Sequence, residues 1–205
     1  MIYMENAMNL PNKITIARIC FIPIFVLLFY LDVLPNHIFI ATLFFILIAF
    51  TDFLDGYIAR KYNLVTNLGK FLDPIADKVL ISTAYILILT KADILKVLWV
   101  DNLVVIFSGI AIAFIMAREL IVSGFRMVAA SANIVLPADK IGKIKTVFQI
   151  ISVLFLLLSG DFFGVQFACQ IFSGIGLITL AIATVLTVMS GLHYIIKNKE
   201  VFKDA

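Results

Sequence analysis

The segment TDFLDGYIARKYNLVTNLGKFLDPIADK, residues 51–78, decides how this chain folds. It joins two long apolar stretches and carries four aspartates at their facing ends: Asp52, Asp55, Asp73 and Asp77. The first two are three residues apart and the last two are four apart, so each pair shares one face of a helix. The polar residues 61–70 between the pairs predict a turn between antiparallel helices. This fold-back would bring all four carboxylates to the same membrane depth.

Four carboxylates in one small space repel one another strongly. Two unit charges about 4 Å apart cost roughly 4 kcal/mol at an effective dielectric constant near 20. Either some of the carboxyl groups are protonated, or cations lie among them. Carboxylate oxygens are hard ligands that suit Mg²⁺ or Mn²⁺. Two such ions assist displacement at phosphorus in many enzymes. A pair of Mg²⁺ or Mn²⁺ ions is therefore one way in which the charge at this position can be neutralised.

The composition is that of a membrane protein. Of the 205 residues, 63% are hydrophobic and 14% are charged, and the mean hydropathy is +1.12. Soluble domains average about 45–50% apolar and about 25% charged residues. We expect one integral membrane domain over residues 1–205. The net charge of only +3 gives no indication of a nucleic-acid partner. The two cysteines lie in apolar segments, without disulfide or zinc spacing.

The hydropathy pattern predicts an all-α fold with six transmembrane helices, over residues 14–34, 38–60, 71–90, 102–128, 140–159 and 165–196. Residues 1–11 are expected at the membrane interface, and residues 197–205 form a solvated tail. Lys91 and Lys96 are the only basic residues in the loops after the first, third and fifth helices. Because basic residues favour the cytoplasmic side, both termini and the aspartates are expected to face the cytoplasm.

A second polar cluster lies at the end of the fourth helix and the start of the fifth. It contains four basic residues: Arg118, Arg126, Lys143 and Lys145. Charges at such depth are costly and usually face a cavity or a partner. The two arginines are eight residues apart, about 80° around a helix, so they can flank one cavity. The two lysines point to different faces, so we expect one of them to enter the site. The cluster suits an anionic substrate that carries a phosphate.

Simpler interpretations exist for each of these features. Aspartates at helix ends can be solvated caps, and Arg18 in the first helix can extend to the interface. Glu119 can pair locally with a nearby base, and the lysines can be topology signals or bind anionic lipid. Capping does not account for two aspartate pairs with small and basic residues beside them.

The spacing of the first motif matches a known family. It reads Asp52-x2-Asp55-Gly56-x2-Ala59-Arg60-x8-Gly69-x3-Asp73-x3-Asp77 and matches, without a departure, the signature of the CDP-alcohol phosphotransferase family. The resemblance implies a six-helix membrane enzyme and a homodimer. It also implies transfer of a phosphatidyl or similar group from a CDP-linked donor to an alcohol, with release of CMP.

The family resemblance assigns roles to individual residues. Asp52, Asp55 and Asp73 would hold the first metal ion, and Asp77, also near the second, would be the general base. Binding of CDP-diacylglycerol would involve seven residues: Asn12, Thr15, Gly56, Ala59, Arg60, Thr66 and Gly69.

Three further segments resemble the bacterial branch of this family that makes phosphatidylglycerophosphate. They are NLPNKIT-x2-R, MARELIVSGFR and GKIKT, residues 9–18, 116–126 and 142–146. This branch implies that CDP-diacylglycerol reacts with sn-glycerol 3-phosphate in a bacterial cytoplasmic membrane, with the active site facing the cytoplasm. Arg118, Arg126, Lys143 and Lys145 would then receive the phosphate of the acceptor.

Two alternatives remain open. Within the family, the acceptor could be inositol phosphate, inositol or serine, although a neutral acceptor would not need four basic residues. From a different class, the chain could be a cation or proton transporter with the aspartates as its ion site. Against a transporter, the aspartates lie at one membrane boundary, and two related halves with broken helices are lacking.

Overall fold

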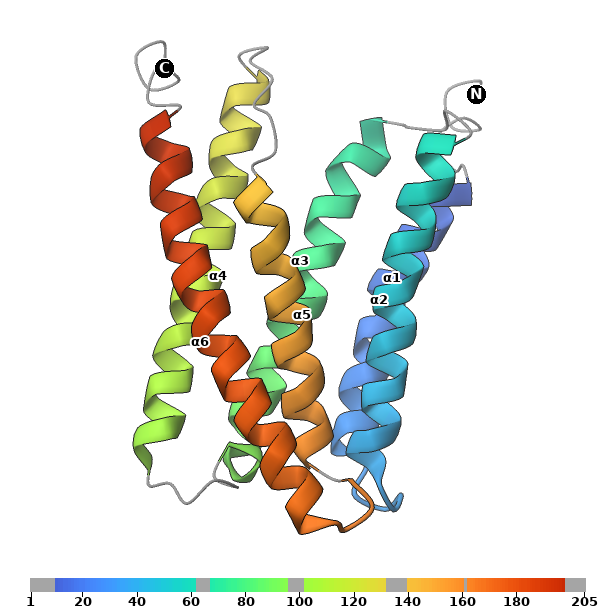
Figure 1. Ribbon diagram of the computed structural model, residues 1–205. Helices are drawn as coiled ribbons and strands as arrows, with labels where there is room; N and C mark the ends of the chain where they lie inside the picture. Colours follow the sequence, from blue (N-terminus) through green and yellow to red (C-terminus); the bar gives the residue numbers. More distant parts are fainter. Residues whose placement is uncertain (1–9, 62–66, 96–101, 132–139, 161, 198–205) are drawn as a thin grey trace.

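Six long helices arranged as a bundle make up this protein (Figure 1). The computed structural model describes residues 10–61, 67–95, 102–131, 140–160 and 162–197. The described elements are α1 (Leu10–Tyr30), α2 (His37–Lys61), α3 (Asn67–Thr90), the short 3₁₀ helix η2 (Ala92–Ile94), α4 (Asn102–Ser131), α5 (Lys140–Gly160) and α6 (Gln166–Lys197). No strand occurs in these ranges, so the all-α prediction is confirmed.

The six predicted helices are all present, and their ends differ from prediction in three places. α1 begins at Leu10 and ends at Tyr30, whereas residues 14–34 were expected, because residues 31–36 form turns in which Asn36 takes a left-handed conformation with φ of 54°. α3 begins at Asn67, so the predicted turn over 61–70 is shorter than expected. α4 continues to Ser131. The predicted interfacial segment and tail lie largely outside the described residues.

Within the part of the chain that the structure describes, four helices are long and apolar enough to cross a membrane. Their candidate spans are Asn12–Tyr30, Asn102–Arg126, Ile141–Gly160 and Gln166–Tyr194. Shorter apolar segments occur in α2 and α3, at His37–Thr51 and Lys78–Thr90, within the described residues. The chain is therefore a helical membrane protein.

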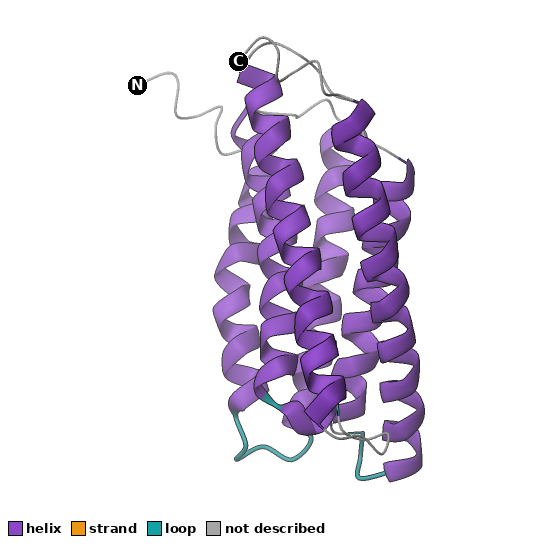
Figure 2. Cartoon of the chain, turned by 90° about the vertical axis from the view of Figure 1, so that its left-hand side faces the viewer, coloured by secondary structure: helices purple, strands orange, loops and turns teal. Residues whose placement is uncertain are grey.

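The sequence motifs meet at one end of the bundle. The start of α1, the end of α2 and the start of α3 lie at the same end as the end of α4, the start of α5 and the end of α6 (Figure 1). Turning the molecule by 90° shows the same arrangement, with the described loops gathered at the opposite end (Figure 2). α1 packs against α2 and α3, while α6 packs against α4 and α5.

Buried residues recur every three or four positions along the inner faces of the helices, as expected for helices packed side by side. In α1 this face is polar near the start, with Asn12, Thr15 and Arg18, and apolar further on, with Phe25 and Phe29. The motif-bearing end of α1 therefore carries its buried polar groups, and the other end carries its apolar core.

The inner face of α6 is built from small residues that allow close helix contact. A Cβ atom added to Gly176 would lie 2.7 Å from Cγ of Leu156 in α5. Ser152 of α5 donates a hydrogen bond to the carbonyl oxygen of Gly176 at 3.1 Å. In lipid, helices gain little from the hydrophobic effect when they associate, so small residues and interhelical hydrogen bonds of this kind hold them together.

At the opposite end of the bundle, Lys91 joins the α1–α2 turn to the end of α3. Its Nζ lies 2.9 Å from Oδ1 of Asp32 and 2.9 Å from Nε2 of His37. Tyr30 and Thr90 share a hydrogen bond of 2.6 Å beside this pair. The hydrogen bond and the charge of Lys91 lower the pKa of the exposed Asp32 carboxyl below its ordinary value of 3.8.

This shift predicts a pH dependence of stability. A carboxylate whose pKa is lower in the folded state stabilises the fold above its ordinary pKa, and this contribution is lost as pH falls through the folded-state pKa. Asp32→Asn should therefore lower the unfolding temperature in detergent at pH 7 by a small amount, because solvent screens this exposed pair. The difference from wild type should close below about pH 3.

The exposed Asp93 of η2 supplies the control. Asp93→Asn should follow the wild-type curve throughout. A constant difference between Asp32→Asn and wild type at every pH would contradict the ionic origin of the effect.

Candidate active site

The acidic motif occupies two helices that adjoin in sequence. Asp52 and Asp55 lie in the last three turns of α2, and Asp73 and Asp77 lie in the first three turns of α3. Both segments are at the same end of the bundle (Figure 1). The predicted placement of the two pairs on a helical hairpin is thus confirmed for the backbone. Their side chains lie outside the described residues, so convergence of the carboxylates stays a prediction.

The residues predicted to bind the nucleotide donor divide into two groups. Gly56, Ala59 and Arg60 lie in α2 and Gly69 in α3, all on backbone that the structure describes, but their side chains are outside it. Thr66 lies outside the described residues.

The other two predicted donor residues, Asn12 and Thr15, are in α1 and are buried, with exposed fractions of 1% and 0%. Arg18, three residues further along the same face, is 1% exposed. The alternative in which Arg18 extends to the interface is therefore wrong. The buried polar and charged side chains of α1 therefore point toward the other helices and not toward lipid.

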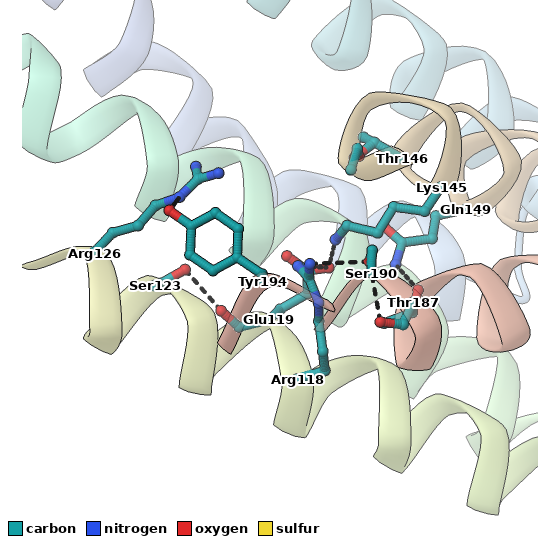
Figure 3. A network of polar contacts seen from close by, with 11 residues as sticks. Arg118, Glu119, Ser123, Arg126, Lys145, Thr146, Gln149, Thr187, Ser190 and Tyr194 are labelled. Atoms are coloured by element: carbon teal, nitrogen blue, oxygen red, sulfur yellow. Dashed lines mark hydrogen bonds and ion pairs between the residues drawn. The ribbon is translucent and has the colours of Figure 1, made fainter. Parts of the chain in front are cut away.

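The second cluster is formed by three helices (Figure 3). Glu119 of α4 pairs with Nζ of Lys145 from α5, and its Oε1 lies 3.6 Å from Nη1 of Arg118. Arg118 also donates a hydrogen bond from Nη2 to Oγ of Ser190 in α6, at 3.0 Å. The side chains of Arg118, Glu119 and Lys145 are only 13%, 17% and 5% exposed. The basic charges are thus held around one carboxylate inside the bundle.

Arg126 also contacts α6, two turns further along α4. Its Nε donates to the hydroxyl of Tyr194 at 3.1 Å, and its guanidinium carbon lies 5.2 Å from the centre of that ring. Phe125 packs edge-to-face on the same ring. Both arginines therefore reach the same neighbouring helix, as their spacing of eight residues indicated (Figure 3).

The structure separates the two lysines of the GKIKT segment. Lys145 is buried and ion-paired, whereas the side chain of Lys143 is exposed. The prediction that they point to different faces is confirmed, and Lys145 is the one that faces the interior. The expectation that Glu119 pairs locally with a base is also confirmed, and the bases come from two helices.

A cleft opens beside Glu119, between α3, α4 and α5. It is small, with a volume of about 40 Å³, and is lined by Lys78, Ile81, Ser82, Tyr85, Ile115, Met116, Glu119, Thr146 and Gln149. The side-chain amide of Gln149 donates to the hydroxyl of Thr187 in α6 at 3.4 Å. The backbone carbonyl oxygen of Gln149 accepts a hydrogen bond from the hydroxyl of Tyr85 at 3.3 Å. Polar groups at such depth in a membrane protein usually mark a functional site. The carboxylate that pairs with Lys145 thus borders a partly polar cleft.

Sequence reasoning missed the contribution of α6. Thr187, Ser190 and Tyr194 recur every three or four residues in a long apolar helix, and Gly191 follows Ser190 directly. This spacing places them on one face. The pattern was available in the sequence, but each residue alone is ordinary for a transmembrane helix.

A helical membrane bundle with paired aspartates on adjoining helices and basic residues around one carboxylate is consistent with a membrane-embedded transferase. The sequence model of the family described as CDP-alcohol phosphatidyltransferase matches residues 8–196. The match covers nearly the whole chain, so this protein belongs to that family.

Three relatives that resemble this chain over nearly their full length bear the name CDP-diacylglycerol–glycerol-3-phosphate 3-phosphatidyltransferase. The Bacillus subtilis (strain 168) protein is 42% identical over 208 residues, covering 96% of this chain and 98% of that protein. The Rickettsia bellii (strain RML369-C) protein is 39% identical over 194 residues, covering 95% and 97%. The Escherichia coli (strain K12) protein is 35% identical over 189 residues, covering 91% and 93%.

The buried ion pair yields a test of stability. Removing one partner of a buried pair leaves an uncompensated charge, so Glu119→Gln should destabilise the protein by about 3 kcal/mol. Adding Lys145→Met should restore much of this loss, since the double variant no longer holds a buried ammonium group without its carboxylate. Unfolding by denaturant in detergent micelles measures both.

Lys143→Met is the matched control, because it removes an exposed lysine two residues away and should change stability little. A double variant that is no more stable than Glu119→Gln alone would show that the pair does not account for the loss.

Proposed function

We propose that this chain transfers the phosphatidyl group from CDP-diacylglycerol to sn-glycerol 3-phosphate, giving phosphatidylglycerophosphate and CMP. The relatives named for this reaction support the proposal over more than nine-tenths of the chain. The structural observation that carries it is the buried network of Arg118, Glu119 and Lys145 at the motif-bearing end of the bundle. A neutral alcohol would give no reason to bury two cations there.

Two Mg²⁺ or Mn²⁺ ions fit the donor set of the acidic motif, which consists of four carboxylates. Asp52, Asp55 and Asp73 would hold the first ion, and Asp77 would also lie near the second. When bound, such ions neutralise the charge of the donor's pyrophosphate and the charge that develops during displacement.

The acid–base chemistry belongs to Asp77. Its carboxylate takes the proton from the primary hydroxyl of glycerol 3-phosphate as that oxygen attacks the β-phosphorus of CDP-diacylglycerol. The new P–O bond forms as the bond to CMP breaks, and CMP leaves. Because a carboxylate is a weak base, its placement next to the hydroxyl supplies much of the advantage.

The nucleotide donor is held by α1, α2 and α3. Gly56 and Ala59 leave room for the cytidine, while Arg60, Thr66 and Gly69 help to hold the nucleotide. The buried Asn12 and Thr15 of α1 contribute hydrogen-bonding groups on the inner face. The acyl chains of the donor remain in the surrounding lipid.

The acceptor's phosphate binds to Arg118, Arg126 and Lys145. Lys145 is paired with Glu119, so an arriving phosphate competes with that carboxylate for the ammonium group. A phosphate carrying two charges competes better than a neutral hydroxyl group, and this favours a phosphorylated acceptor. Lys143 is left out of this set because its exposed side chain lies on a different face of α5 from Lys145, whereas the exposed Arg126 contacts Tyr194 of α6.

The enzyme would act in the cytoplasmic membrane of a bacterium, as a homodimer with six spans. Both helix ends that lead to the termini lie at the motif-bearing end of the bundle, which supports termini on one side (Figure 1). Basic residues favour the cytoplasm for that side. Water-soluble glycerol 3-phosphate and metal ions then reach the site directly.

Release of CMP by the purified protein tests the reaction. Turnover should require CDP-diacylglycerol, glycerol 3-phosphate and Mg²⁺ or Mn²⁺. Asp77→Asn should reduce kcat by at least about 100-fold, because it removes the general base. Inositol, inositol phosphate and serine are supplied one at a time as competing acceptors.

Turnover with one of these other alcohols alone would retain the chemistry and overturn the acceptor. Absence of CMP release with every alcohol, in protein with a normal unfolding transition, would favour an ion transporter that uses the same aspartates.

The two lysines of α5 offer a matched pair of variants for the acceptor site. Lys145→Met should raise KM for glycerol 3-phosphate about tenfold or more, because a charge-assisted contact to phosphate is lost. Lys143→Met should leave KM within about twofold, as its side chain is exposed. Both KM values are measured at saturating CDP-diacylglycerol. Equal effects of the two substitutions would contradict the assignment of Lys145.

A further inference from the structure

The side chain of Arg118 lies directly on the backbone of α6. A Cβ atom added to Gly191 would be 2.8 Å from Cγ of Arg118 and 3.1 Å from its Nε. Real Cβ atoms essentially never come as close as 2.8 Å, so any other residue at this position would displace the arginine. Gly191 is itself buried. Because glycine has no side chain, Gly191 leaves the space that Arg118 occupies.

Ser190, the neighbouring residue, fixes the end of the same side chain. Its hydroxyl donates to the carbonyl oxygen of Thr187 at 3.1 Å. The hydrogen of this hydroxyl is thereby used, so Oγ presents lone pairs to Nη2 of Arg118, 3.0 Å away. This arrangement holds one nitrogen of the guanidinium against α6. The other nitrogen, Nη1, lies on the side of Glu119 and Lys145 (Figure 3).

We propose that Gly191 and Ser190 are positioning residues for the acceptor site. Gly191 sets the depth at which Arg118 lies, and Ser190 sets the rotation of its guanidinium group. Together they aim Nη1 at the position that the acceptor's phosphate takes beside Lys145. This inference rests on the proposed function, in which Arg118 binds that phosphate. A guanidinium binds phosphate through a planar fork, so its orientation matters more than its charge alone.

Other glycines of the described helices show that this contact is specific. The Cβ position of Gly176, on the same helix, would meet the apolar side chain and backbone of Leu156. At Gly109 and Gly124 of α4, an added Cβ would meet nothing within 4 Å. Among these four glycines, only Gly191 is packed against a charged side chain. Its role is thus linked to Arg118 and not to helix packing alone.

Substitution of each glycine by alanine tests this difference. Gly191→Ala should raise KM for glycerol 3-phosphate about tenfold, with kcat and KM for CDP-diacylglycerol within about twofold of wild type. Gly176→Ala crowds the helix interface without touching the arginine, so it should lower the unfolding temperature and leave KM unchanged. Gly124→Ala should leave KM unchanged and should not lower the unfolding temperature, because alanine favours the helix and its Cβ meets no neighbour.

Ser190→Ala is a second, independent variant. It removes an oxygen and adds no atoms, so it tests the inference even if Gly191→Ala does not fold. It should also raise KM for glycerol 3-phosphate, by several fold, and leave KM for the donor unchanged. In an Arg118→Ala background, neither α6 substitution should raise KM further, because both act through that arginine.

The outcomes separate this inference from the proposed function. If wild type releases CMP with glycerol 3-phosphate, but Gly191→Ala and Ser190→Ala leave its KM unchanged, the inference is overturned and the function stands. A wild-type protein that does not use glycerol 3-phosphate overturns both. Equal rises of KM in Gly191→Ala and Gly176→Ala would show that general packing, and not the aim of Arg118, controls acceptor binding.

Discussion

A buried charge needs a partner of opposite sign, and this constraint determines how α4, α5 and α6 are arranged. Moving an isolated ion from water into an apolar interior costs several kcal/mol even after relaxation. Glu119 offsets this cost for Lys145 and lies close to Arg118, and these three residues come from two helices. The third helix, α6, supplies no charge; it supplies the hydroxyl oxygen of Ser190 and the space beside Gly191. These contacts therefore restrict how α4, α5 and α6 can pack around Glu119.

The same constraint explains why the buried charged residues gather at one end of the bundle. Along α1 and α6 the inner face changes character, from polar near the motif-bearing end to small or apolar further away. Close approach between α5 and α6 at Gly176 fixes the apolar end. The tight packing of α5 and α6 at Gly176 holds the bundle together, so the helices need not pack as closely beside Glu119, where the cleft lies. Rigid support far from a site is what keeps its side chains in a productive geometry.

Much of this arrangement could be predicted from the sequence. Hydropathy located all six helices, because an apolar run long enough to cross a bilayer satisfies its backbone hydrogen bonds by forming a helix. The i,i+2 spacing showed that Lys143 and Lys145 face opposite ways, but no local rule could say which of them is inside. That choice depends on Glu119, which lies 26 positions away in the chain. The sequence also could not show that Arg118 lies against Gly191, because this contact joins positions far apart.

The division of contacts among the helices has a consequence for how this protein can diversify. α1 packs with α2 and α3, which carry the motif assigned to the nucleotide donor, whereas α6 packs with α4 and α5, which carry the basic cluster. Under the proposed division of roles, a mutation confined to the α4–α6 group would alter the accepted alcohol while the donor chemistry on α1–α3 is retained. New acceptor preferences would then not require changes in the acidic motif. A bundle divided in this way suits a family whose members share one leaving group and differ in the alcohol they use.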